Sequence, residues 1–581
     1  MANVVTPPSE APAVVLDAEG LDRGVGFLGL LWASETSIIG SGWLFTALGA
    51  AVIAGPSAII GWVLGSIIII SLALVHAELG GLFPVSGGTS RFPHYAFGSF
   101  AGATFGWASY LQAASVAPIE VLACVQYLST AHWARNFYKA HTVGPGTLSG
   151  VGILVAVGLM VFFVVLNLVG IRFLARINGY ITGWKIAIPL ITVLVLLITH
   201  FHPSNFGHAG GGFFPTHTGA LRAILLTMPA GIIFSLLGFE QAVQLGGESS
   251  NPGRDLPRAV IASILIGAAV YLLVQIAFIG AMKPSLLASQ HGWTGLGPTN
   301  TNPTVVKLNA GPFFTVASIA GLSWLATILR IDAVVSPAGT GLIYQTASSR
   351  LSFGLARNGY IPSIFESINQ RTKVPVFGVI VATIIGLLFL LPFPAWSELV
   401  NVVTLVSVVM YAAAPLALSA LRRQKPELPR SYRLPAGEIF APVAFIFATW
   451  VIIFSGWQSY TTFMVAMILG YLIIWLSYLF HLNPKAPPMD WQSAPWILSF
   501  FVGMGLISYF GDFGPGGIIG GVGIFKHVLD QGGNDDLTLG GTLAASAVLA
   551  LGIYWWALAT RLPEHKVDEY VRDVYPPPSV E

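Results

Sequence analysis

The sequence predicts an all-α polytopic membrane protein with about 14 transmembrane helices, and three observations support this prediction. Hydrophobic residues make up 55% of the 581 residues, and the mean hydropathy is +0.76. Only 9% of the residues are charged, whereas about a quarter are charged in an ordinary soluble domain. The apolar residues form runs of about 20, the length that a helix needs to cross the hydrocarbon core. This composition excludes a disordered chain and almost any soluble enzyme.

Composition also limits the partners and cofactors. The formal net charge is +2, so no basic surface is expected to recruit a nucleic acid. A single cysteine excludes a disulfide framework and a cysteine-based metal cluster. No nucleotide-binding loop or catalytic triad is evident, so we expect no enzyme activity, no catalytic residue, no metal and no cofactor. Energy for any transport would then come from an ion gradient or from the gradient of the substrate itself.

Fourteen apolar runs are long enough to span a membrane, and none of them alternates as a barrel strand does. The first seven runs lie near residues 26–50, 57–80, 98–129, 149–170, 178–200, 220–246 and 257–282. The other seven lie near residues 312–346, 374–393, 396–420, 438–457, 460–482, 493–512 and 539–560.

The distribution of Lys and Arg predicts the orientation of the chain in the membrane. With the N-terminus in the cytoplasm, 19 of the 27 basic residues fall on the cytoplasmic side, 6 on the opposite side and 2 inside spans. Cytoplasmic loops carry an excess of positive charge in membrane proteins. We therefore expect a multi-pass protein of the plasma (inner) membrane, in contact with its lipids, with both termini in the cytoplasm.

Two spans carry glycines at their middle, where a regular helix would be weakened. The first span contains Gly40-Ser41-Gly42, and the sixth contains Gly231 and Gly238. Five spans separate these positions, and corresponding interruptions in two halves of a chain predict an inverted-repeat transporter with its binding site at the bilayer midplane. The alternative is that the glycines only allow close packing of helices.

An unwound helix in lipid exposes backbone groups that water cannot reach, and a ligand can pair with them. The half-helix that starts at Gly42 would offer N–H groups and a positive dipole end to a carboxylate. Carbonyl groups before Gly40 and from Phe234 to Leu236 would accept from an ammonium group. A small zwitterionic amino acid matches both. The predicted substrate-binding residues are Ile39, Gly40, Ser41, Gly42, Phe234, Ser235, Leu236 and Gly238.

Several motifs resemble those of the amino acid–polyamine–organocation (APC) superfamily, in the family's order. They are Ile39-Gly40-Ser41-Gly42, Ala77-Glu78-Leu79 with Phe83-Pro84-Val85-Ser86-Gly87-Gly88, Gly246-Gly247-Glu248 with Asn251-Pro252 and Arg254 to Arg258, and Ser349-Arg350-Leu351 through Pro362. The resemblance covers roughly residues 25–425 and implies secondary transport of an amino acid by a five-plus-five inverted repeat. Two additional C-terminal spans depart from the commoner twelve-helix plan and are similar to the branch that contains aspartate:proton symporters.

The predicted organisation follows from these segments. Residues 1–24 form a cytoplasmic tail, residues 25–425 the transport core, residues 438–561 four peripheral helices, and residues 562–581 a second cytoplasmic tail. The last four helices, which have a Gly-rich outer loop at 514–523, are expected to serve packing or oligomer contacts, and the sequence leaves the oligomeric state open.

Charged residues inside spans are costly, so each one needs a reason. For Lys185 in the fifth span, the resemblance implies that the ammonium takes the place of the cation bound by sodium-coupled relatives, and that this lysine couples transport to protons. The alternative is a lysine that extends to the cytoplasmic interface. Glu240 follows the second break; the resemblance implies a role in gating, with Phe234 covering the substrate. The alternative for Glu240 is a structural acceptor for freed backbone amides, and for Phe234 an ordinary core position.

The remaining intramembrane charges have less certain roles. Arg330 and Asp332 are two residues apart, so they point to different faces and should not pair with each other. Asp332 and Ser336 share a face that could approach Lys185. Arg330 could pair with Glu35 or Glu120, or could bind an acidic side chain of the substrate. Structural ion pairs are the alternative for Arg330 and Glu120, and Glu35 is expected to line the site or a gate.

The function predicted from the sequence is import of an amino acid with protons through alternating access. One rival is an inorganic cation transporter of the same fold, for example for potassium. Others are an amino acid exchanger, a sodium-coupled transporter, and a receptor that binds an amino acid without transporting it.

Overall fold

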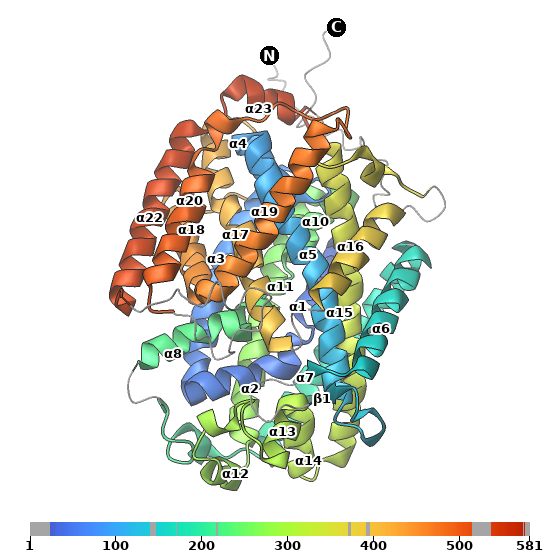
Figure 1. The fold of residues 1–581 in the computed structure, drawn as a ribbon, viewed down its shortest axis with the longest axis vertical. Coiled ribbons are helices and arrows are strands. Elements are labelled where there is room, and N and C mark those ends of the chain that lie inside the picture. Colours follow the sequence, from blue (N-terminus) through green and yellow to red (C-terminus); the bar gives the residue numbers. More distant parts are fainter. Residues whose placement is uncertain are drawn as a thin grey trace, which may run out of the picture.

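The chain folds into a bundle of long helices, and this computed structural model describes residues 24–139, 147–169, 171–215, 219–369, 374–390, 396–513, 536–572 and 574–575 (Figure 1). Helices occupy all fourteen predicted spans. The first half contains α1 (Phe27–Ile38), α2 (Gly42–Ala54), α3 (Ala58–Leu82), α5 (Ser99–Leu128), α6 (Gly150–Val169) and α7 (Ile171–Thr199). The second half contains α8 (Ala220–Leu226), α9 (Ile233–Ser235), α10 (Glu240–Gln244), α11 (Pro252–Ala281), α15 (Ser323–Arg357), α16 (Val376–Phe389) and α17 (Trp396–Gln424).

The remaining elements lie at the C-terminus and in the connections. The C-terminal spans are α18 (Gly437–Phe454), α19 (Gly456–Leu479), α20 (Trp496–Phe510) and α22 (Leu539–Thr560). The short helices are α4 (Gly88–Phe97), α12 (Pro284–Ser289), α13 (Pro303–Ala310), α14 (Pro312–Ile319) and α23 (Glu564–Tyr570). Strands β1 (Tyr138–Lys139) and β2 (Thr147–Leu148) form one antiparallel pair, in which Tyr138 lies opposite Leu148.

Length and apolarity agree with the predicted number of spans. Among the described residues, ten helical segments are long and apolar enough to cross a membrane, and three more apolar helical segments are shorter. One of the ten, Gly42–Leu82, contains both α2 and α3 and so covers parts of two predicted spans. The protein is therefore an all-α polytopic membrane protein, as the sequence predicts.

The predicted eighth span, 312–346, is wrong in its boundaries. The structure divides it into α14, which ends at Ile319, and α15, which continues to Arg357. Gly321 between them has φ +76°, in the left-handed region that glycine adopts without strain. Its N–H donates to the carbonyl of Ser318, and the N–H of Leu322 donates to the carbonyl of Ala317. This is the pattern of a helix that ends at a glycine. The apolar run continues across this turn, so hydropathy alone did not reveal it.

Corresponding helices of the two halves pack against each other. The contacts pair α3 with α11, α5 with α15, and α6 with α16, and they also bring α1 next to α10. In a five-plus-five arrangement, these contacts pair the second span with the seventh, the third with the eighth, the fourth with the ninth, and the first with the sixth. Such pairing of equivalent helices agrees with the inverted repeat that the sequence predicts. The broken segments therefore lie in the middle of the core, surrounded by the paired helices.

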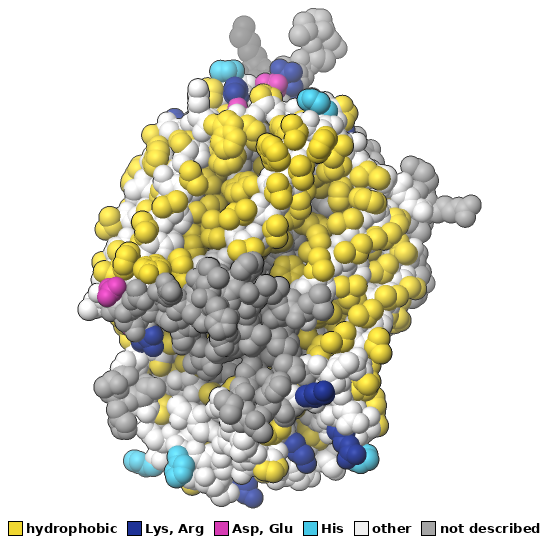
Figure 2. All heavy atoms as spheres, in the orientation of Figure 1, with side chains coloured by type: hydrophobic (Ala, Val, Ile, Leu, Met, Phe, Trp, Pro, Cys, Tyr) yellow, Lys and Arg dark blue, Asp and Glu magenta, His cyan; other side chains and the backbone are white. Residues whose placement is uncertain are grey.

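Burial separates central from peripheral helices. The apolar windows of α5 and α17 are buried along their full length, whereas those of α6 and α19 are only 28% buried. Figure 2 shows hydrophobic side chains over the upper and right-hand parts of one face, with the charged side chains mainly toward its two ends. Apolar side chains such as Leu154, Leu194 and Leu498 are exposed on the outside of the bundle. An apolar band between polar ends is the surface that a bilayer covers.

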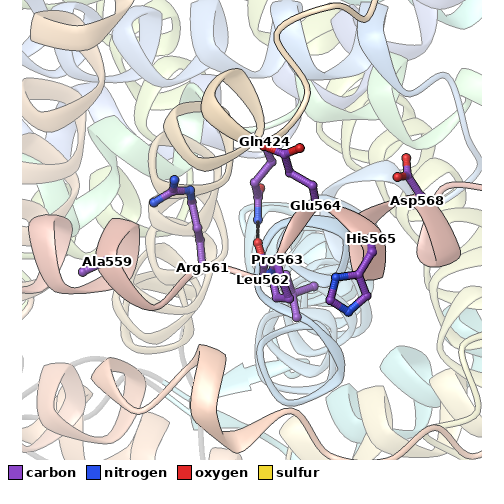
Figure 3. A pocket seen from close by; sticks show the side chains of 8 residues that line it. All are labelled: Gln424, Ala559, Arg561, Leu562, Pro563, Glu564, His565 and Asp568. Carbon is purple, nitrogen blue, oxygen red and sulfur yellow. Dashed lines mark hydrogen bonds between the residues drawn. The ribbon is translucent and has the colours of Figure 1, made fainter.

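The four C-terminal spans pack on the outside of the core. α18 contacts α17 and α3, α19 contacts α17 and α5, and α22 contacts α18 and α20. The chain then crosses the end of the molecule that carries α4, where α23 contacts α4 (Figure 1). At this α4 end, the Gln424 side-chain amide donates to the carbonyls of Ala96 and Leu562, and an open pocket lies beside it (Figure 3). The described C-terminal segment is thus fastened to the core.

Asp490 is the centre of this attachment. It lies in the α19–α20 connection and accepts hydrogen bonds from Lys566 Nζ at 2.7 Å, Tyr570 Oη at 2.7 Å and the backbone N–H of Ser99 at 3.1 Å. Partial burial raises the pKa of Asp490, but the hydrogen bonds from Lys566, Tyr570 and Ser99 outweigh it and hold the pKa below its ordinary value of 3.8. Because the pKa is lowered in the folded state, this stabilisation is complete above pH 3.8 and is lost as the pH falls further.

We expect Asp490→Asn to speed hydrogen exchange of the α23 amides roughly tenfold at pH 7, since the carboxylate that forms an ion pair with Lys566 becomes a neutral amide. The wild-type protein should show the same loosening only at pH values below 3.8. Hydrogen exchange with mass spectrometry measures both effects. The control is Glu569→Gln, which removes an exposed charge from the same helix. Equal exchange in Asp490→Asn and wild type would show that other contacts hold α23.

Candidate functional site

The first predicted break is present and lies between α1 and α2. α1 ends at Ile38, α2 begins at Gly42, and Ile39 has φ −88° and ψ 78°, outside the helical region. Gly40 and Ser41 fall in the same interruption, so the chain has no continuous helix there. The interruption leaves the N-terminal amides of α2 and the C-terminal carbonyls of α1 facing the core.

The second predicted break is also present. A π-helical turn covers Met228–Ile232, α9 ends at Ser235, and α10 begins only at Glu240. Gly231 and Gly238 have φ values of +151° and +128°, which side chains rarely adopt. A Cβ atom on Gly238 would lie 2.6 Å from the backbone nitrogen of Ile38. Glycine is needed here both for the backbone angle and for the close approach of the two breaks.

The two breaks enclose a small cavity. Its volume is about 10 Å³, room for about one water molecule. An amino acid does not fit in this volume, so the site is contracted in this conformation. The lining residues are Ser37, Ile38, Gly40, Gly42, Val116, Glu120, Phe234, Leu237, Thr340 and Tyr344.

Glu120 on α5 binds the backbone at the first break. One carboxylate oxygen accepts from the backbone N–H of Ser41 at 2.8 Å, and the other accepts from the Ser41 hydroxyl at 3.0 Å. Both Glu120 and Ser41 are fully buried. The partner of Glu120 is therefore the unwound segment, whereas the sequence had suggested Arg330 as one partner.

Lys185 on α7 binds the other side of the same break. Its Nζ donates to the carbonyl of Thr36, near the end of α1, and to the Thr340 hydroxyl on α15 at 2.7 Å. The Thr340 hydroxyl in turn donates to the Thr36 carbonyl at 2.8 Å. Lys185 is fully buried, so it does not extend to an interface. Its ammonium joins three helices at the point where the first one stops.

Relatives of known function indicate what this arrangement belongs to. The family model described as amino acid permease matches residues 25–474. The chain is 33% identical to a glutamate/serine transporter of Bacillus subtilis (strain 168), with 95% of this chain and 96% of the relative covered. It is also 33% identical to an aspartate-proton symporter of the same strain, with 94% and 98% covered. The chain belongs to the amino acid permease family. Membership confirms the predicted resemblance and the prediction of a membrane transporter of amino acids rather than an enzyme.

Glu240 connects the second break of the permease to three core helices. It accepts from the Gly238 backbone N–H at 2.8 Å and from the hydroxyls of Tyr344 on α15 and Tyr411 on α17, at 2.8 and 2.5 Å. Gln112 on α5 donates to it at 3.4 Å. The contact with a freed backbone amide is the one that the structural alternative predicted. The tyrosine contacts additionally hold α10 against α15 and α17.

Asp332 and Ser336 share a face of α15, and the Ser336 hydroxyl donates to Asp332 at 2.6 Å, as their spacing predicts. Asp332 also accepts from the indole N–H groups of Trp43 and Trp184, at 3.1 and 2.8 Å. The described hydrogen bonds of Lys185 go to Thr36 and Thr340 rather than to Asp332. Asp332 thus lies next to α7, the helix that carries Lys185, but it accepts its hydrogen bonds from Ser336 and the two tryptophans.

Arg330 and Glu35 lie outside the cavity lining. The guanidinium of Arg330 lies 4.4 Å from the ring centroid of Phe314, a cation–π contact. Among the described residues, no salt bridge joins Arg330 to Glu35, Glu120 or Asp332. Glu35 is buried, and neither of its carboxylate oxygens has a hydrogen-bond partner among the described residues. The residues that the structure describes contain no cluster of His, Cys, Asp or Glu arranged for a metal.

An aromatic lid formed by Trp396, Phe45 and Phe234 packs against the first break. Trp396, at the start of α17, donates its indole N–H to the Ser41 hydroxyl at 2.8 Å. Its ring stacks on Phe45 with centroids 5.0 Å apart and meets Phe234 edge-on at 5.8 Å. Phe234 also lines the cavity, and Trp396 packs against it.

The α4 end is closed by contacts between segments that are distant in sequence. Glu248, after α10, pairs with Arg350 near the end of α15 at 2.8 Å. Val25 forms a parallel bridge with Ser249, and Ser86 an antiparallel bridge with Leu245. The permease is consequently closed on both sides of the site in this conformation.

The sequence reasoning found Asp332 and Ser336 but missed the other two residues of a polar stripe on α15 and the lid residue Trp396. The stripe consists of Asp332, Ser336, Thr340 and Tyr344, all buried and four residues apart. This spacing puts them on one face of a helix, and a polar face buried in a membrane protein marks a functional path. The spacing is readable in the sequence and could have revealed Thr340 and Tyr344. No comparable signal distinguishes Trp396 from the other tryptophans.

Gly42→Ala is expected to weaken amino acid binding at least about tenfold. A Cβ at this position would lie 2.5 Å from the Ser235 hydroxyl and 3.1 Å from the Ser235 Cα, so the methyl group would take up space beside the N–H groups that are predicted to bind the substrate. Gly49→Ala on the same helix is the matched control, because the nearest atom to its Cβ is 3.9 Å away. Binding of radiolabelled amino acid to the purified proteins measures the difference. Equal affinity in both variants would place the substrate elsewhere.

Proposed function

We propose that this permease imports an amino acid together with protons, by alternating access to the site between the two breaks. The observation that carries the proposal is the meeting of two unwound segments at a buried cavity with Lys185 bound to the end of α1. N–H groups at the start of α2 and carbonyl groups at the end of α9 suit the two charged groups of a zwitterion. The family and its named members support the same activity.

The binding mode follows from the polarity of the two breaks. The amino acid carboxylate would bind the N–H groups at the start of α2, from Gly40 to Gly42, where the helix dipole is positive. The ammonium would bind carbonyls at the end of α9 and in the following turn, from Phe234 to Leu236. Phe234 and Trp396 would cover the bound substrate. Because the cavity holds only about one water molecule, binding requires the two segments to move apart.

The substrate is proposed to be a small amino acid, and the names of the relatives select the first ones to test. One relative is a glutamate/serine transporter, and another an aspartate-proton symporter. Glutamate, aspartate and serine are therefore the first candidates. Arg330 lies away from the cavity lining, so the case for an acidic substrate rests on the relatives and not on this residue.

Lys185 is proposed to carry the coupling proton. In the closed conformation its ammonium is satisfied by the Thr36 carbonyl and the Thr340 hydroxyl. A movement of α1 away from α7 would remove the Thr36 carbonyl and leave a buried cation short of partners, which is costly. Release of the proton would remove that cost. The contact between Lys185 and α1 thus makes proton release depend on the opening of the site.

The α4 end is proposed to face the cytoplasm, since the excess of Lys and Arg predicted on the inner side includes Arg350, Arg422 and Lys566 from this end. Glu240 and the Glu248–Arg350 pair would then form the inner gate, and Trp396 with Phe234 the outer one.

Uptake into proteoliposomes tests the proposal. Radiolabelled glutamate, aspartate and serine are supplied outside at pH 6.0 with an interior at pH 7.5, and accumulation above the external concentration is expected for at least one of them. Dissipating the pH gradient with a protonophore should abolish accumulation. Dependence on sodium without dependence on pH would favour sodium coupling. Strict one-for-one exchange, potassium flux without amino acid flux, or binding without flux would favour the respective rivals.

A further inference from the structure

Glu120 occupies the position that the substrate carboxylate is proposed to take. Its carboxylate accepts from the Ser41 backbone N–H at 2.8 Å and from the Ser41 hydroxyl at 3.0 Å, at the N-terminal end of α2. It also lines the cavity between the two breaks, together with Gly40 and Gly42. An anion that accepts from the first amides of a helix is bound in the manner of a carboxylate ligand.

We propose that Glu120 is a built-in stand-in for the α-carboxylate of the substrate, which the substrate must displace in order to bind. This inference rests on the proposed function and adds a role for a residue on α5. Without an anion, the Ser41 N–H would be buried and unpaired at the break, which costs free energy. Glu120 satisfies it and so stabilises the contracted site in the absence of an amino acid.

The geometry also places Glu120 in the same region as a group of opposite charge. A Cβ on Gly40 would lie 2.8 Å from a Glu120 carboxylate oxygen and 2.7 Å from the Thr340 hydroxyl, so both groups border the same point of the unwound segment. The Thr340 hydroxyl accepts from Lys185 Nζ at 2.7 Å. A carboxylate that leaves Ser41 therefore moves within a region that contains the ammonium of Lys185, the opposite charge that a buried carboxylate needs. Substrate binding would thereby be connected to the proposed proton carrier.

A stand-in and a structural residue give opposite predictions for substrate affinity. Removing a competing carboxylate should make the amino acid bind more tightly, whereas removing a structural contact at the site should make it bind more weakly. Glu120→Gln keeps an acceptor oxygen but loses the charge that roughly doubles the strength of such a bond. Glu120→Asp keeps the charge, but its carboxylate is one methylene shorter and cannot reach Ser41 from the same backbone position.

The experiment measures binding of radiolabelled glutamate, aspartate and serine to the purified full-length protein in detergent. Glu120→Gln and Glu120→Asp are each expected to bind the substrate about tenfold more tightly than wild type. Glu438→Gln is the matched control, since it makes the same substitution at an exposed position on α18. Its affinity should equal that of wild type.

Equal or weaker binding of the amino acid in both Glu120 variants would overturn the stand-in role and leave the proposed function intact. Failure of all proteins, wild type included, to bind any of the three amino acids would instead overturn the proposed function and this inference with it. Size-exclusion chromatography identifies a variant that does not fold, and the other variant then decides.

Discussion

Lys185→Met is expected to abolish accumulation of the amino acid driven by a pH gradient, with a fall of at least about tenfold in the steady-state level. Methionine has a similar length but carries no proton. The Thr36 carbonyl and the Thr340 hydroxyl would lose the ammonium that joins them to α7. Proteoliposome uptake with an inward proton gradient is the measurement, and exchange of internal for external amino acid, which needs no net proton movement, is measured alongside it.

Lys185→Arg separates the charge of this residue from its ability to release a proton. Arginine keeps a cation near Thr36 but is not deprotonated in proteins. We therefore expect Lys185→Arg to retain binding and to lose accumulation. Lys307→Met, on the exposed surface of α13, is the control for the substitution itself. Full accumulation in Lys185→Met would mean that another group carries the proton.

Glu240→Ala is expected to lower the rate of uptake at least about tenfold and to loosen α10. The substitution leaves the hydroxyls of Tyr344 and Tyr411 and the Gly238 N–H without their common acceptor in a fully buried place. Each unpaired buried group destabilises the closed conformation. Hydrogen exchange of residues 236–244 should rise in parallel with the loss of uptake.

Glu240→Gln should be the milder variant, because its amide oxygen still accepts while the charge is lost. Gln345→Ala is the control on α15: it removes a buried side chain whose amide donates to Val379 and Thr383, away from the gate. A gating role is supported if the rate of uptake is lowest in Glu240→Ala, intermediate in Glu240→Gln and highest in the control. Normal uptake in Glu240→Ala, with unchanged exchange in α10, would reduce Glu240 to a local backbone acceptor.

The two breaks were predictable because their cause is local. Glycine at positions 40, 42 and 238 weakens a helix wherever it occurs, and the spacing of five spans is visible in a hydropathy profile. The limits of α15 were not predictable, because the turn from Ala320 to Leu322 interrupts the apolar run and contains no polar side chain. The length of an apolar run indicates that a segment crosses the membrane, but it does not show where the helix begins and ends.

The buried charges show where prediction from the sequence stopped. That each of them needed a partner followed from the cost of charge in a membrane. Which partner each one found did not follow. Glu120 bonds a backbone amide 79 residues away, and Arg330 contacts a phenylalanine ring instead of a carboxylate.

The sequence by itself determined the class of protein, the number of spans and the places where two helices unwind, because hydropathy and glycine act over a few residues. Only the tertiary structure decided that Lys185 joins α7 to the end of α1, that Trp396 covers the site, and that Glu120 fills it. These contacts depend on how each helix is rotated and how closely it approaches its neighbours. Side-chain packing over the whole core sets both quantities, and no short segment records them.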